Sequence, residues 1–135
     1  MISPASRAYR ILKPMSSYVD AIEDPGWIDK LPSQPEIGAD EVILGVYTNS
    51  VSTLDEAIVF TTLALYLFVS DGWRELKYSD IYQVISPKDK ELVSGVEIVR
   101  NGKENFWLPV RGVKDGKFYD AYEVVRFLLR VMPSK

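Results

Sequence analysis

Carboxylates are the only side chains of this sequence whose grouping suggests chemistry. They gather at Asp55-Glu56, at Asp80, and at Asp89 with Glu91, and two carboxyl groups in one site can act as general acid and base. In turns and at strand edges, however, aspartate and glutamate usually face solvent or cap backbone N–H groups. We therefore interpret these residues as surface and capping groups and predict no catalytic residue.

Histidine and cysteine are both absent from the chain. A Ser–His–Asp triad, a thiolate nucleophile and a cysteine-ligated metal site each need one of them, so all three are excluded. The carboxylates lack the spacing of a calcium loop, and the glycines at 95, 102, 112 and 116 are isolated, unlike those of a phosphate-binding loop. A serine–lysine pair stays open, but no spacing points to one. We predict that the protein is not an enzyme and has no metal site and no cofactor.

The composition is that of an ordinary globular protein. The 135 residues, of which 47% are hydrophobic and 26% charged, suit one domain. The longest apolar run, residues 63–69, is too short to cross a bilayer, which takes about 20 residues, and the first residues lack the apolar segment of a signal peptide. The net charge of −3 argues against nucleic acid as the main partner. We expect a cytoplasmic protein with no stable membrane insertion.

Residues 57–81 are the stretch around which the other elements are organised. From Ile58 onward, β-branched and aromatic residues fall on both sides of a two-residue repeat, which indicates strands rather than a helix. We expect a tight bend near residues 61–64 that divides this run into two strands. Asp71-Gly72 is then a strong hairpin signal, and residues 73–79 supply the returning strand.

The remainder of the chain continues with short strands and ends in a helix. We expect strands at residues 41–48, 81–85, 92–100 and 105–110, with Asn101-Gly102 as the turn between the last two. About seven short strands in succession are typical of a barrel or a sandwich. From Phe118 the apolar residues recur at helical spacing until Pro133, and arginines near the end suit the helix dipole.

The first 40 residues are expected to form a helical and irregular arm. Ser3-Pro4 predicts the start of a helix over residues 5–12, and residues 15–22 predict a second turn or two of helix. Residues 23–40 contain several prolines and indicate an irregular connection that its apolar residues pin onto the domain. The alternative is an arm that docks onto another chain. For that role the candidate contact residues are Tyr9, Tyr18 and Trp27, because a short broken helix has little core of its own.

The apolar face of the C-terminal helix is broader than one sheet contact requires. We expect four of its residues to plug the open end of the sheet structure, namely Tyr122, Val125, Leu128 and Leu129. Val124, Phe127 and Val131 widen this face and are candidates for contact with the N-terminal helices or with a second subunit. Trp73 and Trp107 occur in predicted strands, where they pack across strands or, alternatively, form an exposed aromatic patch for a protein partner.

The order of these elements and several local motifs resemble the bacterial pleckstrin-homology-like (PH-like) domain family. The motifs are Phe60-Thr61 at the end of a hydrophobic strand, Leu65-Tyr66 in the next, and Tyr78-Ser79-Asp80-Ile81 at the start of the following element. The resemblance covers roughly residues 41–132. It implies a mainly β fold with α structure, a seven-stranded bent antiparallel barrel capped by a C-terminal helix and preceded by short N-terminal helices. Residues 1–40 would be the arm and 41–135 the barrel with its helix, in one compact domain.

The resemblance also implies where a ligand would bind. In that fold the loop at 49–56, Asp71 and the hairpin at 100–103 share one end of the barrel, so the candidate ligand-binding residues are Asn49, Asp71, Arg100 and Lys103. The first loop carries two carboxylates and no cation, which argues against phosphoinositide binding. We favour a non-catalytic module that works through protein–protein contact, in partner binding, immunity-type blocking or self-assembly. The alternative is a small ligand or a lipid headgroup at the open barrel end.

Overall fold

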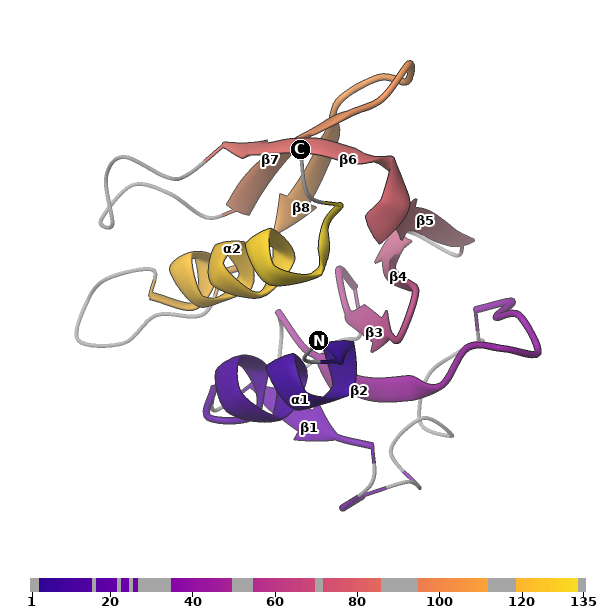
Figure 1. Ribbon diagram of the computed structural model, residues 1–135. Helices are drawn as coiled ribbons and strands as arrows, with labels where there is room; N and C mark the ends of the chain where they lie inside the picture. Colours follow the sequence, from indigo (N-terminus) through magenta and orange to yellow (C-terminus); the bar gives the residue numbers. More distant parts are fainter. Residues whose placement is uncertain are drawn as a thin grey trace.

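The computed structural model describes residues 3–15, 17–21, 23–24, 26, 35–49, 55–69, 72–85, 95–111 and 119–133. In these residues the fold is mainly β, with two antiparallel sheets, a C-terminal helix and a short N-terminal helix (Figure 1). The larger sheet has five strands in sequence order: β1 (Tyr18–Asp20), β2 (Ile43–Tyr47), β3 (Ile58–Thr61), β4 (Ala64–Val69) and β5 (Gly72–Lys77). The smaller sheet has three strands: β6 (Ile81–Ile85), β7 (Gly95–Arg100) and β8 (Phe106–Pro109).

Most of the predicted elements are confirmed. The strands from β2 to β8 lie within a few residues of the expected positions, and α2 (Tyr119–Val131) is the predicted C-terminal helix. The hairpin at Asn101-Gly102 is also confirmed, with a positive φ of 67° at Gly102. A 3-10 turn, η3 (Tyr78–Asp80), joins the two sheets. None of the helices in the described residues has the length and apolar character that a membrane crossing requires.

The N-terminal segment differs from the prediction in its second half. Helix α1 (Pro4–Arg7) begins at Ser3, whose hydroxyl accepts the N–H of Ser6, and continues into the π-helical turn η1 (Ala8–Leu12). The second helical segment, expected at residues 15–22, was wrong, because residues 18–20 form β1 and pair with β2. A helix of one or two turns has little stability of its own, whereas the strand gains backbone hydrogen bonds from β2.

The expected bend between β3 and β4 is confirmed, and a side chain holds it. Thr62 and Leu63 connect the two strands, but neither has the positive φ that two-residue hairpin turns usually require. Instead, the hydroxyl of Thr61 accepts the N–H groups of Leu63 (3.2 Å) and Ala64 (3.0 Å). The side chain therefore supplies the acceptor for the turn.

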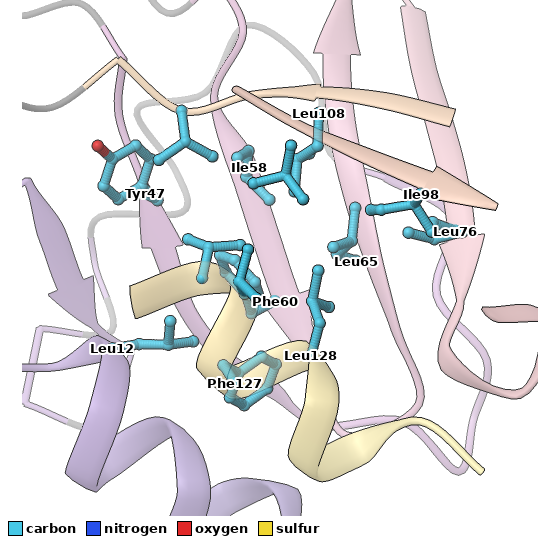
Figure 2. Packing of buried hydrophobic residues seen from close by; sticks show 14 of the residues in the cluster. Leu12, Tyr47, Ile58, Phe60, Leu65, Leu76, Ile98, Leu108, Phe127 and Leu128 are labelled. Atoms are coloured by element: carbon cyan, nitrogen blue, oxygen red, sulfur yellow. The ribbon is translucent and has the colours of Figure 1, made fainter. Parts of the chain in front are cut away.

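The main hydrophobic core lies between the two sheets, α2 and the N-terminal helical segment (Figure 2). Phe127 lies at its centre, edge-on to Phe60 at 5.5 Å and to Tyr78 at 5.8 Å between ring centroids. Leu12 of η1 and Leu128 of α2 are fully buried beside it. The first residues of the chain thus belong to the same core as the C-terminal helix.

The buried face of α2 is rotated relative to the prediction. Val125 and Leu128 are buried as expected, but Leu129 is 52% exposed and Tyr122 is partly exposed. Ala121 and Val124 are fully buried instead. The helix has to contact both the smaller sheet and the N-terminal segment (Figure 1), and this requirement turns it toward the Val124 side.

A second cluster covers the opposite face of the larger sheet. Its buried members are Val46, Ala57, Val59, Ala64, Tyr66 and Phe68, with Ile37, Ile43 and Trp73 beside them. Trp73 lies opposite Phe68 on the neighbouring strand, with their rings 5.0 Å apart, so its predicted cross-strand packing is confirmed. Both faces of this sheet are therefore buried, and residues 35–41 approach its outer face.

Candidate functional site

A hollow of the described structure lies beside the β3–β4 turn, and we call it the acidic hollow. Its volume is about 640 Å³, a size that suits a bound ligand or an inserted side chain. Its acidic lining residues are Glu36, Asp40, Glu41 and Glu75, with Lys77 as the one cation among the described lining residues. Its apolar lining residues include Pro4, Leu63, Val131 and Pro133.

Glu41 is the best-connected carboxylate of the acidic hollow. Its Oε1 accepts the N–H of Gly38 at 2.9 Å, and its Oε2 accepts the hydroxyl of Thr61 at 2.6 Å. Burial raises the pKa of Glu41, but these hydrogen bonds, another from Tyr66 and the charge of Lys77 together lower it by more. Glu41 is therefore ionised at neutral pH and fixed in position.

The hydroxyl of Tyr66 lies between two carboxylates. It is 2.8 and 3.0 Å from the two carboxylate oxygens of Glu41 and 3.1 Å from Oε2 of Glu75. Burial, followed by the hydrogen bonds to the two glutamates, raises the pKa of Tyr66 well above its usual value. The phenol therefore keeps its proton, but it has only one. When the Tyr66 hydroxyl donates its proton in a hydrogen bond to Glu41, no proton lies between the Tyr66 oxygen and the carboxylate of Glu75.

The floor of the acidic hollow is held by bonds between side chains and backbone. The buried hydroxyl of Tyr78 donates to the carbonyl of Thr61 at 2.8 Å, and the N–H of Tyr78 donates to the carbonyl of Leu63 at 3.0 Å. Thr62 exchanges two further hydrogen bonds with the backbone of Val42. These contacts fix the turn, so the carboxylates are presented from a rigid support.

The carboxylates singled out from the sequence have other partners. Glu56 pairs with Arg111 and Asp80 with Lys103, each at 2.7 Å. The hydrogen bond from Arg111 lowers the pKa of Glu56, and that from Lys103 lowers the pKa of Asp80. Both are surface ion pairs. Asp89 and Glu91 lie outside the described residues.

Of the predicted ligand-binding residues, Asn49 has a structural role. Its amide nitrogen donates to the carbonyls of Glu56 (2.7 Å) and Pro109 (2.9 Å), and its amide oxygen accepts the N–H of Arg111 (2.6 Å). These bonds join the segment before β3 to the end of β8. They use the side chain's donors and acceptor, so little remains for a ligand.

The structure does not bring the predicted ligand-binding residues together. Asn49 is bound to Pro109, which pairs with Gly95 at one end of the β7–β8 hairpin. Arg100 ends β7 and Lys103 lies in the turn after it, at the other end of the hairpin, about 15 Å away along the strands. Arg100 donates to the carbonyl of Glu104 at 2.8 Å, and Lys103 pairs with Asp80. Asp71 lies outside the described residues.

The predicted protein-contact residues divide between surface and core. Tyr9 is 60% exposed, with the ammonium of Lys13 at 4.2 Å from its ring centroid, and Val131 lines the acidic hollow. Tyr18 is buried 6.1 Å from the ring of Phe60.

Two of the remaining contact candidates, Val124 and Phe127, offer no surface. Val124 and Phe127 are fully buried in the core that α2 shares with the N-terminal helical segment, which is the first of the two contacts expected for them. Trp27 lies outside the described residues.

Trp107 combines the two roles considered for it. It is 49% exposed on the outer face of the smaller sheet, opposite Glu97. Its ring nevertheless lies against the backbone of Gly95 so closely that any side chain there would collide with it. Trp107 is thus fixed by its own sheet while one side of the ring stays accessible.

The residues of the acidic hollow were missed because they are distant in the sequence. Glu41 precedes β2, Tyr66 lies in β4, and Glu75 lies opposite Tyr66 in β5. The β4–β5 hairpin was predicted from the sequence, and a hairpin places residues of its two strands opposite each other. It was therefore the signal that could have brought Tyr66 and Glu75 together. Comparisons of the chain with protein-family models, with curated proteins and with solved structures found no match. We therefore base the proposed function on the geometry and charge of the acidic hollow.

Proposed function

We propose that this chain is a non-catalytic binding module that contacts a protein partner, and that its acidic hollow receives a basic side chain of that partner. One observation carries the proposal: the single proton of the Tyr66 hydroxyl lies within hydrogen-bond distance of both Glu41 and Glu75. An ammonium or guanidinium group would supply the additional donors that this arrangement lacks. Hydrogen bonds between charged groups are also the strong ones.

The shape of the acidic hollow suits a long basic side chain. Lysine and arginine have an apolar stem and a charged head, and they place the stem along apolar surface. Leu63, which is 47% exposed, and Val131 offer such surface in the lining of the hollow, and the carboxylates of the same lining offer partners for the head group. The volume exceeds that of one side chain, so residues that flank it in the partner would also make contact.

The charge of the chain favours the same class of partner. The four carboxylates around the hollow outnumber its one described cation, and the whole chain has a net charge of −3. Such a field attracts basic surfaces and repels phosphate backbones. This supports a protein partner and gives no support to nucleic acid.

The PH-like relationship is part of the proposal. The seven strands from β2 to β8, followed by α2, have the order expected for that family. Thr61, Tyr66 and Tyr78, which carry the resemblance, all support the acidic hollow. The motif residues would then serve to present a contact site.

The test is an NMR titration of the full chain with short lysine- and arginine-containing peptides. We expect shifts concentrated in residues 38–41, 62–66 and 75–77, and at least tenfold weaker binding by Glu75→Gln, because a charge-assisted hydrogen bond is worth about 1.5–3 kcal/mol. The matched control is Glu97→Gln on the outer face of the smaller sheet, which should bind like the parent. Equal binding by parent and Glu75→Gln would refute the proposal.

A second arm separates a protein contact from a small-ligand site. N-acetyl-lysine methylamide and N-acetyl-arginine methylamide present the same head groups without neighbouring residues. A protein-contact site should bind the peptides more tightly than these single residues. If the single residues bind equally well, the hollow is a site for small amines and not for a protein partner.

A further inference from the structure

A second site is formed where β5 and the β7–β8 hairpin meet, and its centre is the buried ring of Phe106. The guanidinium carbon of Arg74 lies 5.0 Å from the centroid of this ring, and that of Arg100 lies 5.5 Å from it. Phe106 is 1% exposed, so the ring is fixed and the two guanidinium groups are held by one platform. Both positive charges are thus placed around one aromatic ring.

The described structure provides few acceptors for these two groups. The Nε of Arg100 donates to the carbonyl of Glu104 at 2.8 Å. The contact found for Arg74 in the described residues is the ring of Phe106 itself. A guanidinium carries five N–H donors. Most of the donors of this pair therefore remain for a ligand.

Lys103 adds to the positive charge. Lys103 pairs with Asp80 at 2.7 Å, and the charges of Lys77 and Arg100 also act on this carboxylate. Three cations thus act on one aspartate in the described structure. A single carboxylate ligand would leave much of this charge uncompensated, whereas a phosphate monoester carries about −1.5 to −2 at pH 7.

We propose that Arg74 and Arg100, held on the ring of Phe106, bind a phosphate group, with Lys103 beside them. The planar fork of each guanidinium matches two phosphate oxygens. This site is distinct from the acidic hollow, because Arg74 lies opposite Leu67 of the main core, whereas its neighbour Glu75 lies opposite Tyr66 on the other face of the sheet. The two faces of β5 thus bind ligands of opposite charge.

The experiment measures binding of inorganic phosphate and of O-phosphoserine to the full chain, by calorimetry and by the NMR signals of the arginine Nε–H groups. We expect both ligands to shift the Nε–H signals of Arg74 and Arg100. Arg74→Gln and Arg100→Gln should each weaken binding at least tenfold. The matched control is Arg126→Gln, which removes an exposed arginine paired with Glu123 on α2 and should change binding less than twofold.

Two further measurements keep the outcome decisive. Arg74→Lys keeps the charge but loses the fork, so it should bind phosphate more weakly than the parent and more tightly than Arg74→Gln. Vesicles that contain phosphatidic acid present the same group on a membrane. Binding to the vesicles but to neither soluble phosphate would overturn the proposal, and so would an equal loss of binding in Arg126→Gln. Glu75→Gln should leave phosphate binding intact, so this test can succeed or fail independently of the acidic hollow.

Discussion

Tyr47 donates a 2.7 Å hydrogen bond to Asp120 and so joins the larger sheet to the first turn of α2. Tyr47 is fully buried at the end of β2, and Asp120 lies near the helix N-terminus, where a negative charge is favourable. This bond anchors the start of the helix that closes the main core. It also gives a buried phenol an acceptor inside the protein.

Replacing Tyr47 by phenylalanine should destabilise the fold without changing its shape. We expect Tyr47→Phe to lower the free energy of unfolding by about 2 kcal/mol, because a hydrogen bond to a charged group is lost. Urea denaturation measures this. The control is Tyr9→Phe at a 60% exposed position, which should stay within about 0.5 kcal/mol of the parent. If the double variant with Asp120→Ala shows additive losses, the bond carries no coupling energy.

The β3–β4 turn should depend on the hydroxyl of Thr61 more than on its methyl group. Thr61→Val keeps the shape but leaves the N–H groups of Leu63 and Ala64 without this acceptor, so we expect a loss of about 2–3 kcal/mol. Thr61→Ser keeps the acceptor and should cost about 1 kcal/mol for the lost methyl group. Thermal and urea unfolding of both variants measure the difference. A larger loss in Thr61→Ser than in Thr61→Val would show that packing, and not the turn, determines the residue.

Glu41 should give stability a pH dependence. Its folded pKa lies below the ordinary value of 4.5, so its ionised form stabilises the fold fully above that pH and loses this effect as the pH falls through the folded pKa. At pH 7, Glu41→Gln should be less stable than the parent by about 1–2 kcal/mol. The difference should shrink below pH 4.5, because glutamine resembles the protonated acid. Urea denaturation from pH 7 to pH 3 tests this, and a difference that grows on acidification would contradict it.

Gly45 should be required for the pairing of β1. A Cβ at this position would collide with the Tyr18 side chain and with the backbone carbonyl of Val19. Because backbone must move, we expect Gly45→Ala to cost about 2–3 kcal/mol and to speed hydrogen exchange in β1. Gly72→Ala is the control, since nothing lies within 4 Å of an added Cβ there. Unchanged exchange in β1 would show that the strand tolerates the displacement.

The strands and α2 could be predicted because they depend on local patterns. The two-residue repeat around Ile58 and the helical spacing after Phe118 both reflect faces that are buried in the fold. The arm was harder to predict, because the apolar spacing of Met15 and Tyr18 fits a helix as well as a turn followed by a strand. Only the backbone of β2, which lies far along the chain, decides between them.

The acidic hollow could not be predicted from the sequence because it depends on register. A turn centred on Asp71-Gly72 places Lys77 opposite Tyr66. The structure pairs Val69 with Gly72, which places Glu75 there instead. This difference in register places the carboxylate of Glu75, and not the ammonium of Lys77, beside the Tyr66 hydroxyl. It therefore reverses the sign of the charge that a ligand of this site would need. The contribution of Glu41 also requires the path of residues 35–41 over the sheet, which no local pattern encodes.

The walls of the acidic hollow come from both extremes of the described chain, since Pro4 lies on it with Val131 and Pro133. During synthesis on the ribosome, Glu41, Tyr66 and Glu75 emerge long before α2 does. A chain that ends before α2 would carry the acidic groups without Val131 and Pro133 beside them. Under the proposed function, a basic partner would therefore meet the complete hollow only after translation has passed α2.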